Sequence, residues 1–116
     1  MKLEVTSRKE KDDIAVVTVR GRLTIQHGSR LLEEVKRLAE AGTRHVVVDL
    51  SQVNYIDSFG VGQMVGSHTS LRRQGGQVRY AGIQPKILEL IEISGVPKIL
   101  KWDPDVRTGL AKLTDA

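Results

Sequence analysis

The stretch that decides the fold is RHVVVDLSQVNYIDSFGVG, residues 44–62. Residues 44–50 are nearly continuous in apolar side chains, a pattern typical of a strand that is covered on both faces. Residues 51–57 are predicted to form a loop, and the glycine-rich segment after it opens a helix over residues 58–74. A strand that leads through a short loop into a helix is the repeating unit of α/β proteins.

The same alternation extends to both sides of this unit. Further strands are expected where short β-branched or alternating runs occur, at residues 3–7, 14–19, 77–81 and 99–102. Further helices are expected where apolar residues recur at helical spacing, at residues 28–41, at residues 85–94, and from Pro104 onward with Asp103 as the N-cap. Because parallel neighbours need crossover helices, this order predicts an α/β fold with a mixed, largely parallel sheet of four or five strands and about four helices.

In such a sheet the functional loops gather at the carboxyl ends of the strands. This rule points to residues 23–28 and to residues 51–57 as the two segments that form the site.

The composition is that of a soluble globular protein with one domain. The chain of 116 residues is long enough for a single core, with residues 14–113 as that core and residues 1–12 as a possible edge strand and turn. The absence of cysteine excludes disulfides and thiol chemistry. No run approaches the roughly 18 apolar residues of a membrane span, and the N-terminus has no apolar signal segment, so we expect a cytoplasmic protein.

Charge and motifs exclude several classes of function. The formal net charge is only +4, with Lys and Arg interleaved with acidic residues, and aromatic residues make up 3% of the chain. Direct binding of nucleic acid is therefore not expected. The sequence has no phosphate-binding glycine loop, no dinucleotide fingerprint and no metal-ligand spacing, so neither a cofactor nor a metal is expected.

A family resemblance starts within residues 44–62. Residues 49–51 (DLS) and 56–62 (IDSFGVG) are similar to D-L-S, a short spacer and D-S-S-G-L-G, the hallmark of STAS domains and anti-sigma factor antagonists. Residues 21–23 (GRL), 75–76 (GG) and 94–96 (SGV) resemble the G-x-L, G-G and S-G-L positions of that family. The likeness covers nearly the whole chain and implies the STAS fold.

The resemblance also implies a function. Antagonists of this family bind an anti-sigma factor that is also a serine kinase, and so free a sigma factor. Phosphorylation of the first Ser of the motif, here Ser58, switches binding off, and a serine phosphatase acts on phospho-Ser58. The resemblance thus implies a binding protein that is not an enzyme and has no catalytic residues. The residues expected to contact the partner are Thr24, Asp57, Ser58, Phe59, Gly60, Val61 and Gly62.

The chemistry of Ser58 supports this role independently. Ser58 is predicted to be the N-cap of its helix, where its hydroxyl would accept hydrogen bonds from backbone N–H groups. A phosphate there would face the positive end of the helix dipole and need not unfold the domain. It would add about −1.5 to −2 charges, enough to spoil an interface at that spot. For Asp57 two roles remain open, tightening the turn through the backbone or shaping the phosphoacceptor site and contacting the partner.

Two residues depart from the family pattern. Phe59 stands where Ser or Thr is common, and Thr24 stands where Asp is frequent. Phe59 is expected either to pack against residues 51–56 or to be exposed as an apolar anchor for the partner. The predicted helix contains three glycines, each of which destabilises it by roughly 0.8–1 kcal/mol relative to Ala. Close packing or contact with a partner would explain them: Gly60, Gly62 and Gly66.

Two other functions were weighed. A hydrolase would need a histidine beside Ser58, but His68 lies about 15 Å along the same helix and His45 opens the strand whose far end leads to Ser58. Only His27 belongs to a loop at the same edge. The second alternative is a STAS scaffold or accessory subunit of another assembly, such as a signalling complex or a lipid transporter, without a phosphoswitch.

Overall fold

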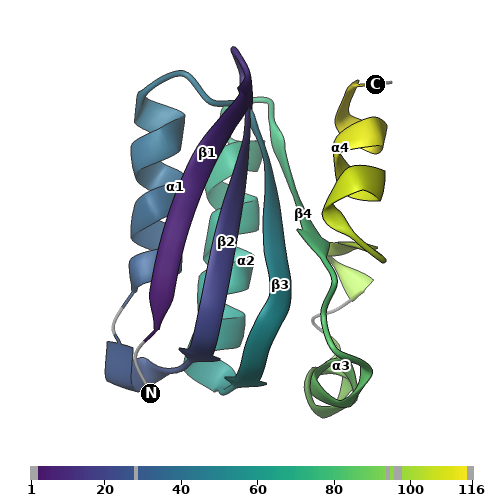
Figure 1. Ribbon diagram of the computed structural model, residues 1–116. Helices are drawn as coiled ribbons and strands as arrows, with labels where there is room; N and C mark the ends of the chain where they lie inside the picture. Colours follow the sequence, from purple (N-terminus) through teal and green to yellow (C-terminus); the bar gives the residue numbers. More distant parts are fainter. Residues whose placement is uncertain (1–2, 28, 94, 96–97, 115–116) are drawn as a thin grey trace.

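A five-stranded mixed sheet forms the centre of the molecule, with helices on both of its faces (Figure 1). The structure is a computed structural model that describes residues 3–27, 29–93, 95 and 98–114. The strand order is β1-β2-β3-β4-β5; β1 runs antiparallel to β2, and the other neighbouring pairs are parallel. The predicted α/β fold with a largely parallel sheet is therefore confirmed.

The elements follow one another in the predicted alternation. Their bounds are β1 (Glu4–Lys11), β2 (Ile14–Leu23), the 3-10 turn η1 (Ile25–His27), α1 (Arg30–Glu40), β3 (His45–Ile56), α2 (Ser58–Arg72), β4 (Gln77–Ala81), α3 (Pro85–Glu92), β5 (Lys101–Asp103) and α4 (Val106–Thr114). The edge strand β1 is present and longer than expected. Predictions that involve Gly28, Ser94, Val96 and Pro97 lie outside the described residues.

Strand β3 is longer than the sequence suggests, and the predicted loop at residues 51–57 is wrong. The parallel pairing of β2 with β3 continues through two register shifts to the pair Leu23 and Ile56. In this extension Val53 and Ile56 are buried, whereas the residues between and before them are exposed. The register shift after Val53 adds one residue to β3, which brings these two side chains, three residues apart, to the core side of the strand. As a result, Asp57 alone separates the end of β3 from the start of α2.

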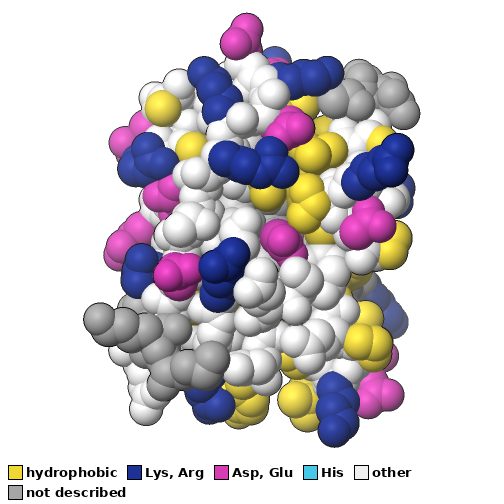
Figure 2. Space-filling model, in the orientation of Figure 1, with side chains coloured by type: hydrophobic (Ala, Val, Ile, Leu, Met, Phe, Trp, Pro, Cys, Tyr) yellow, Lys and Arg dark blue, Asp and Glu magenta, His cyan; other side chains and the backbone are white. Residues whose placement is uncertain are grey.

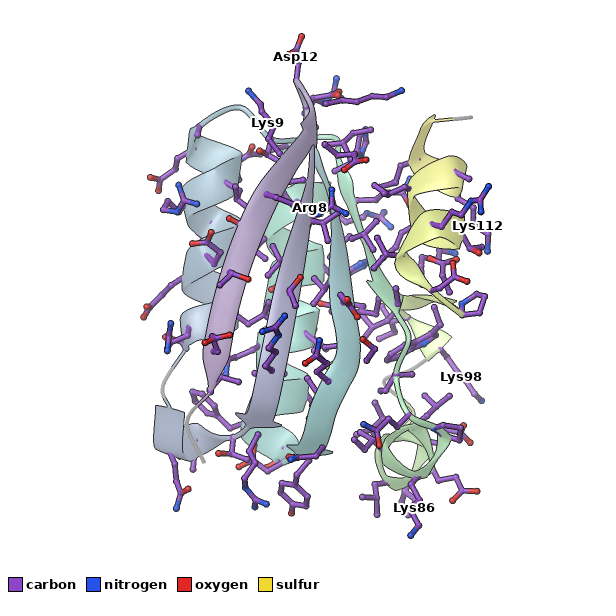
Figure 3. The ribbon with its side chains drawn as sticks, in the orientation of Figure 1. Arg8, Lys9, Asp12, Lys86, Lys98 and Lys112 are labelled. Atoms are coloured by element: carbon purple, nitrogen blue, oxygen red, sulfur yellow. The ribbon has the colours of Figure 1, made fainter. Side chains whose placement is uncertain are left out.

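The start of the last helix is also different from the prediction. Asp103 is the final residue of β5 and not the cap of α4, because its buried carboxylate accepts hydrogen bonds from Arg79 at 2.8 and 3.1 Å. The Lys112 ammonium of α4 lies 2.8 Å from the same carboxylate (Figure 3). Asp105 takes the capping role, since its carboxylate accepts from the Thr108 N–H, and α4 begins at Val106.

The core has a large part and a small part. Helices α1, α2 and α3 bury their apolar side chains against one face of the sheet, around Val17, Val48 and Tyr80. On the other face α4 covers a smaller cluster centred on Val16 and Val47. Figure 2 shows hydrophobic side chains at the surface where the sheet meets α4, and charged side chains of both signs over the strands. None of the helices in the described ranges is long and apolar enough to cross a membrane.

Candidate functional site

The candidate site lies where the carboxyl ends of β2 and β3 meet the start of α2, at the lower end of the sheet in Figure 1. The N–H of Asp57 donates to the carbonyl of Leu23 at 3.3 Å. This bond joins the segment that follows β3 to the end of β2. Although residues 51–56 are strand, the two chain segments that the carboxyl-end rule selected do come together here.

Asp57, and not Ser58, is the N-cap of α2. Its Oδ1 accepts from the N–H of Gly60 at 2.9 Å, and its backbone is extended, as an N-cap requires. Its Oδ2 accepts from the N–H of Ile25 at 3.1 Å, a bond that reaches across to η1. Asp57 therefore has the first of its two predicted roles, a bond to the local backbone, and it also holds the two segments of the site in register.

Ser58 is the exposed first residue of α2. Because Asp57 occupies the N–H of Gly60, a phosphate on Ser58 would not replace the cap. It would lie at the surface, beside a carboxylate and near the positive end of the helix dipole. The added charge would therefore be displayed to whatever approaches this end of the helix.

Phe59 is exposed, with 37% of its surface accessible. Its ring lines a shallow apolar hollow between the start of α1 and the start of α2, together with Leu32, Ser58 and Gly62. Of the two positions considered for Phe59, the structure shows the exposed one.

Two more apolar side chains surround the site. Ile25 is 65% exposed and Tyr55 is 38% exposed, and the Arg22 guanidinium lies 4.5 Å from the centre of the Tyr55 ring. The sequence prediction did not select them, because it placed both residues in loops, where an apolar side chain alone does not indicate whether it is buried. The usable signal is one large apolar residue in each of the two segments that were expected to meet at the carboxyl ends of the strands. Together with Phe59 they form the exposed apolar surface of the site.

The remaining predicted contacts lie at different depths. Thr24 is 4% exposed, and its Oγ1 has no hydrogen-bond partner among the described residues. Gly60 is also buried, whereas Val61 is half-buried and Gly62 is exposed. Ser58, Phe59 and Gly62 thus form the surface, while Thr24 and Gly60 lie beneath it.

Gln63 is a structural residue that sequence reasoning missed. Its buried Oε1 accepts from the N–H of Leu31 at 3.1 Å and from that of Leu32 at 3.4 Å. It therefore caps α1, whose own N-cap residue, Ser29, makes no side-chain cap bond. A helical glutamine whose partners lie 31 and 32 residues away gives no local signal.

Neither of the two histidines whose side chains are described, His45 and His68, forms a catalytic site with Ser58. His45 is at the start of β3, the opposite end from Ser58, and its Nδ1 accepts from the N–H of Gln77. His68 lies along α2, where burial, Arg72 and Lys101 lower its pKa. The side chain of His27 lies outside the described part of the chain. Among the described residues, no group of three or more His, Cys, Asp or Glu could hold a metal ion.

Comparisons with known proteins agree with this architecture. A family model described as the STAS domain matches residues 6–109. The anti-sigma-B factor antagonist of Bacillus subtilis is 28% identical over 100 residues, which cover 86% of this chain and 90% of that protein.

Two solved structures share the fold. The crystal structure of an anti-sigma factor antagonist from Mycobacterium paratuberculosis superimposes with a TM-score of 0.83 at 18% identity, covering 97% of this chain and 95% of that one. The phosphorylated form of the Bacillus cell fate determinant SpoIIAA superimposes with a TM-score of 0.71 at 13% identity, covering 94% of this chain and 98% of the other.

Proposed function

The chain belongs to the STAS domain family, and from this we propose that it is an anti-sigma factor antagonist that is switched by phosphorylation of Ser58. In this proposal the protein binds an anti-sigma factor that is also a serine kinase and thereby frees a sigma factor. It acts in the cytoplasm as a binding protein and not as an enzyme. The observation that carries the proposal is an exposed serine at the first position of α2, bordered by exposed apolar side chains.

The exposed apolar surface supports partner binding. Ile25, Tyr55 and Phe59 surround the end of β3 and the start of α2, and aromatic anchors dominate the energy of many interfaces. Similarity to the Bacillus subtilis antagonist points to an anti-sigma factor as the partner. Phe59 and Tyr55 would be buried against it.

Phosphorylation would switch this surface without changing the fold. The Ser58 side chain makes no hydrogen bond with a described residue, so a phosphate breaks nothing inside the domain. It adds about −1.5 to −2 charges beside Asp57, and two neighbouring anions are costly to desolvate in an interface. A serine phosphatase that acts on phospho-Ser58 would restore binding.

The test uses the purified protein, its anti-sigma kinase and ATP. Mass spectrometry should find phosphate on Ser58 alone, and Ser58→Ala should remain unmodified while still forming the complex. Ser58→Asp should weaken the complex by at least about tenfold, because it places a charge at the interface. Full affinity of the Ser58→Asp variant would contradict the proposal.

Phe59→Ala provides a second readout of the same surface. We expect a loss of affinity of at least about tenfold, the usual effect of truncating a buried aromatic anchor. An unchanged affinity, within about a factor of two, would remove Phe59 from the interface. Affinity capture from the source cell that returned neither a sigma regulator nor a kinase would favour the scaffold or accessory role instead.

A further inference from the structure

Two shallow hollows lie along the boundary between α1 and α2, the first of them at the candidate site. Ser58 and Phe59 line the first hollow, Lys36 and Arg73 line the second, and Leu32 lines both. The two helices lie side by side on one face of the sheet (Figure 1), so the hollows follow one another along the same pair of helices, and we call the two together the groove. The face that carries α4 is a different surface.

Gly62, on the α2 side of the groove, differs from the other two glycines of α2. A Cβ at Gly60 would lie 2.2 Å from the carbonyl oxygen of Leu23, and a Cβ at Gly66 would lie 3.2 Å from Leu32 Cδ2. A Cβ at Gly62 would meet no described atom within 4 Å outside the adjacent part of its own helix. Since glycine inside a helix costs about 0.8–1 kcal/mol relative to Ala, its presence at 62 is explained by close approach from outside.

The far end of the groove is positively charged. Lys36 and Arg73 both line it, and no acidic residue does. Neither cation forms an ion pair within the described part of the chain, whereas Arg37 and Arg79 are paired with carboxylates. The groove therefore changes from an apolar end at Phe59 to a cationic end at Arg73.

We propose that this groove receives a helix of the anti-sigma factor, an inference that rests on the proposed function. A small or apolar face of that helix packs over Leu32 and Gly62, and a carboxylate at its far end pairs with Lys36 and Arg73. The walls are helices, whose backbone groups bond within themselves and offer no sheet edge to an added strand, so a helix is the segment whose backbone needs nothing from these walls. From Gly62 to Arg73 α2 rises about 16 Å, which is room for about three turns.

Filling the open space at Gly62 tests the packing part of this inference. Gly62→Leu should fold at least as stably as the wild type, because leucine is a better helix former and a Cβ at this position meets no described atom outside the adjacent helix. Its affinity for the anti-sigma factor should fall by at least about tenfold, because the side chain occupies the path of the helix. Gly62→Ala, which adds one methyl group, should show the smaller loss.

Charge reversal tests the electrostatic part. Affinity of the double variant Lys36→Glu, Arg73→Glu should fall at least about tenfold at about 50 mM salt and much less at about 500 mM, where exposed charges are screened. The matched control is Lys98→Glu, Arg107→Glu, which changes the net charge equally outside the groove (Figure 3 shows Lys98). Its affinity should stay within about twofold of wild type.

The results separate this inference from the function on which it rests. If wild type binds the anti-sigma factor and Ser58→Asp releases it, but the groove variants bind like their controls, the groove inference is wrong and the function stands. If wild type binds no anti-sigma factor, both are wrong. In a charge swap, a carboxylate of the anti-sigma factor is changed to Lys and tested with the Lys36→Glu, Arg73→Glu variant. Recovered binding would identify that carboxylate as the partner of Lys36 and Arg73.

Discussion

Asp57 and Asp103 both lie where a strand finishes at the carboxyl end of the sheet, yet their surroundings differ. Asp103 is the last residue of β5; it is buried, and its charge is balanced by Arg79 and Lys112. Asp57 directly follows β3; it is half-buried, and its partners among the described residues are the backbone N–H groups of Gly60 and Ile25. Each oxygen of the two carboxylates has a partner, but only Asp103 is neutralised by side-chain cations of the described chain.

The difference separates a structural carboxylate from one at the proposed binding surface. A buried charge must be paired, because desolvation costs several kcal/mol per ion, and the Asp103 cluster is paired to fasten α4 to the sheet. Backbone donors hold Asp57 in place without cancelling its charge, so a partner or a phosphate on Ser58 meets that charge directly. The Asp57 carboxylate is thus held in a fixed position and keeps its charge. The Asp103 carboxylate under α4 is also held in a fixed position, but its charge is balanced.

The largest effect is expected at the Asp103 cluster. Asp103→Asn keeps the size of the side chain but removes the charge that balances Arg79, whose side chain is only 12% exposed. Breaking a buried pair from one side costs about 3 kcal/mol or more in the free energy of unfolding. Urea denaturation followed by the fluorescence of Trp102, the single tryptophan, measures this loss.

The pH dependence of that loss is its control. Burial alone would raise the pKa of Asp103, but hydrogen bonds from Arg79 and Lys112 outweigh it and lower the pKa below the ordinary value of 3.8. Because the folded pKa is depressed, the stabilisation is complete above the unfolded pKa and is lost as pH falls through the folded pKa. The difference between wild type and Asp103→Asn should thus be full near pH 7 and shrink below about pH 4. A difference that did not change with pH would contradict the ion-pair explanation.

The second effect tests how rigidly the site is built. Gly60→Ala puts a Cβ 2.2 Å from the Leu23 carbonyl oxygen and 2.9 Å from Ile56 Cγ2, so backbone must move. We expect a loss of about 2 kcal/mol in the free energy of unfolding, as for other overpacked positions. The matched control is Gly62→Ala on the same helix, which should instead gain up to about 1 kcal/mol.

If the free energy of unfolding falls for Gly60→Ala and rises for Gly62→Ala, close backbone packing at Gly60 supports the start of α2 beside Asp57. Equal destabilisation at both positions would mean that α2 needs glycine for another reason. The same denaturation experiment gives both values.

The fold was predictable because hydrophobic periodicity is a local property. β4 has its predicted bounds, and α2 begins at the predicted Ser58. The end of β3 was not predictable, since residues 51–56 form a strand only through pairing with β2. Asp103 was mistaken for a cap because Asp before Pro is a common helix start, and its real partners are distant in sequence.

The position of the site was predictable from strand order, but its internal bonds were not. Asp57 and Ser58 are adjacent and both are good N-caps, so only geometry decides between them. The bond from Asp57 to Ile25 and the cap that Gln63 supplies to α1 join segments far apart in the chain. The burial of Thr24, between the end of β2 and η1, likewise depends on tertiary packing.

The smallest effect is expected at Thr24, whose buried Oγ1 has no hydrogen-bond partner in the described part of the chain, and it distinguishes a supporting role from contact with the partner. Thr24→Val keeps the shape of the side chain and removes that polar atom, so the free energy of unfolding should rise by up to about 1 kcal/mol. Affinity for the anti-sigma factor should stay within about twofold, because the side chain lies beneath the surface that carries Ser58. A fivefold or greater loss of affinity with unchanged stability would show that the hydroxyl reaches the partner, as the sequence predicted. The end of β3 at Asp57 would then have to open on binding, whereas Asp103 is already paired with Arg79 and Lys112 inside the domain.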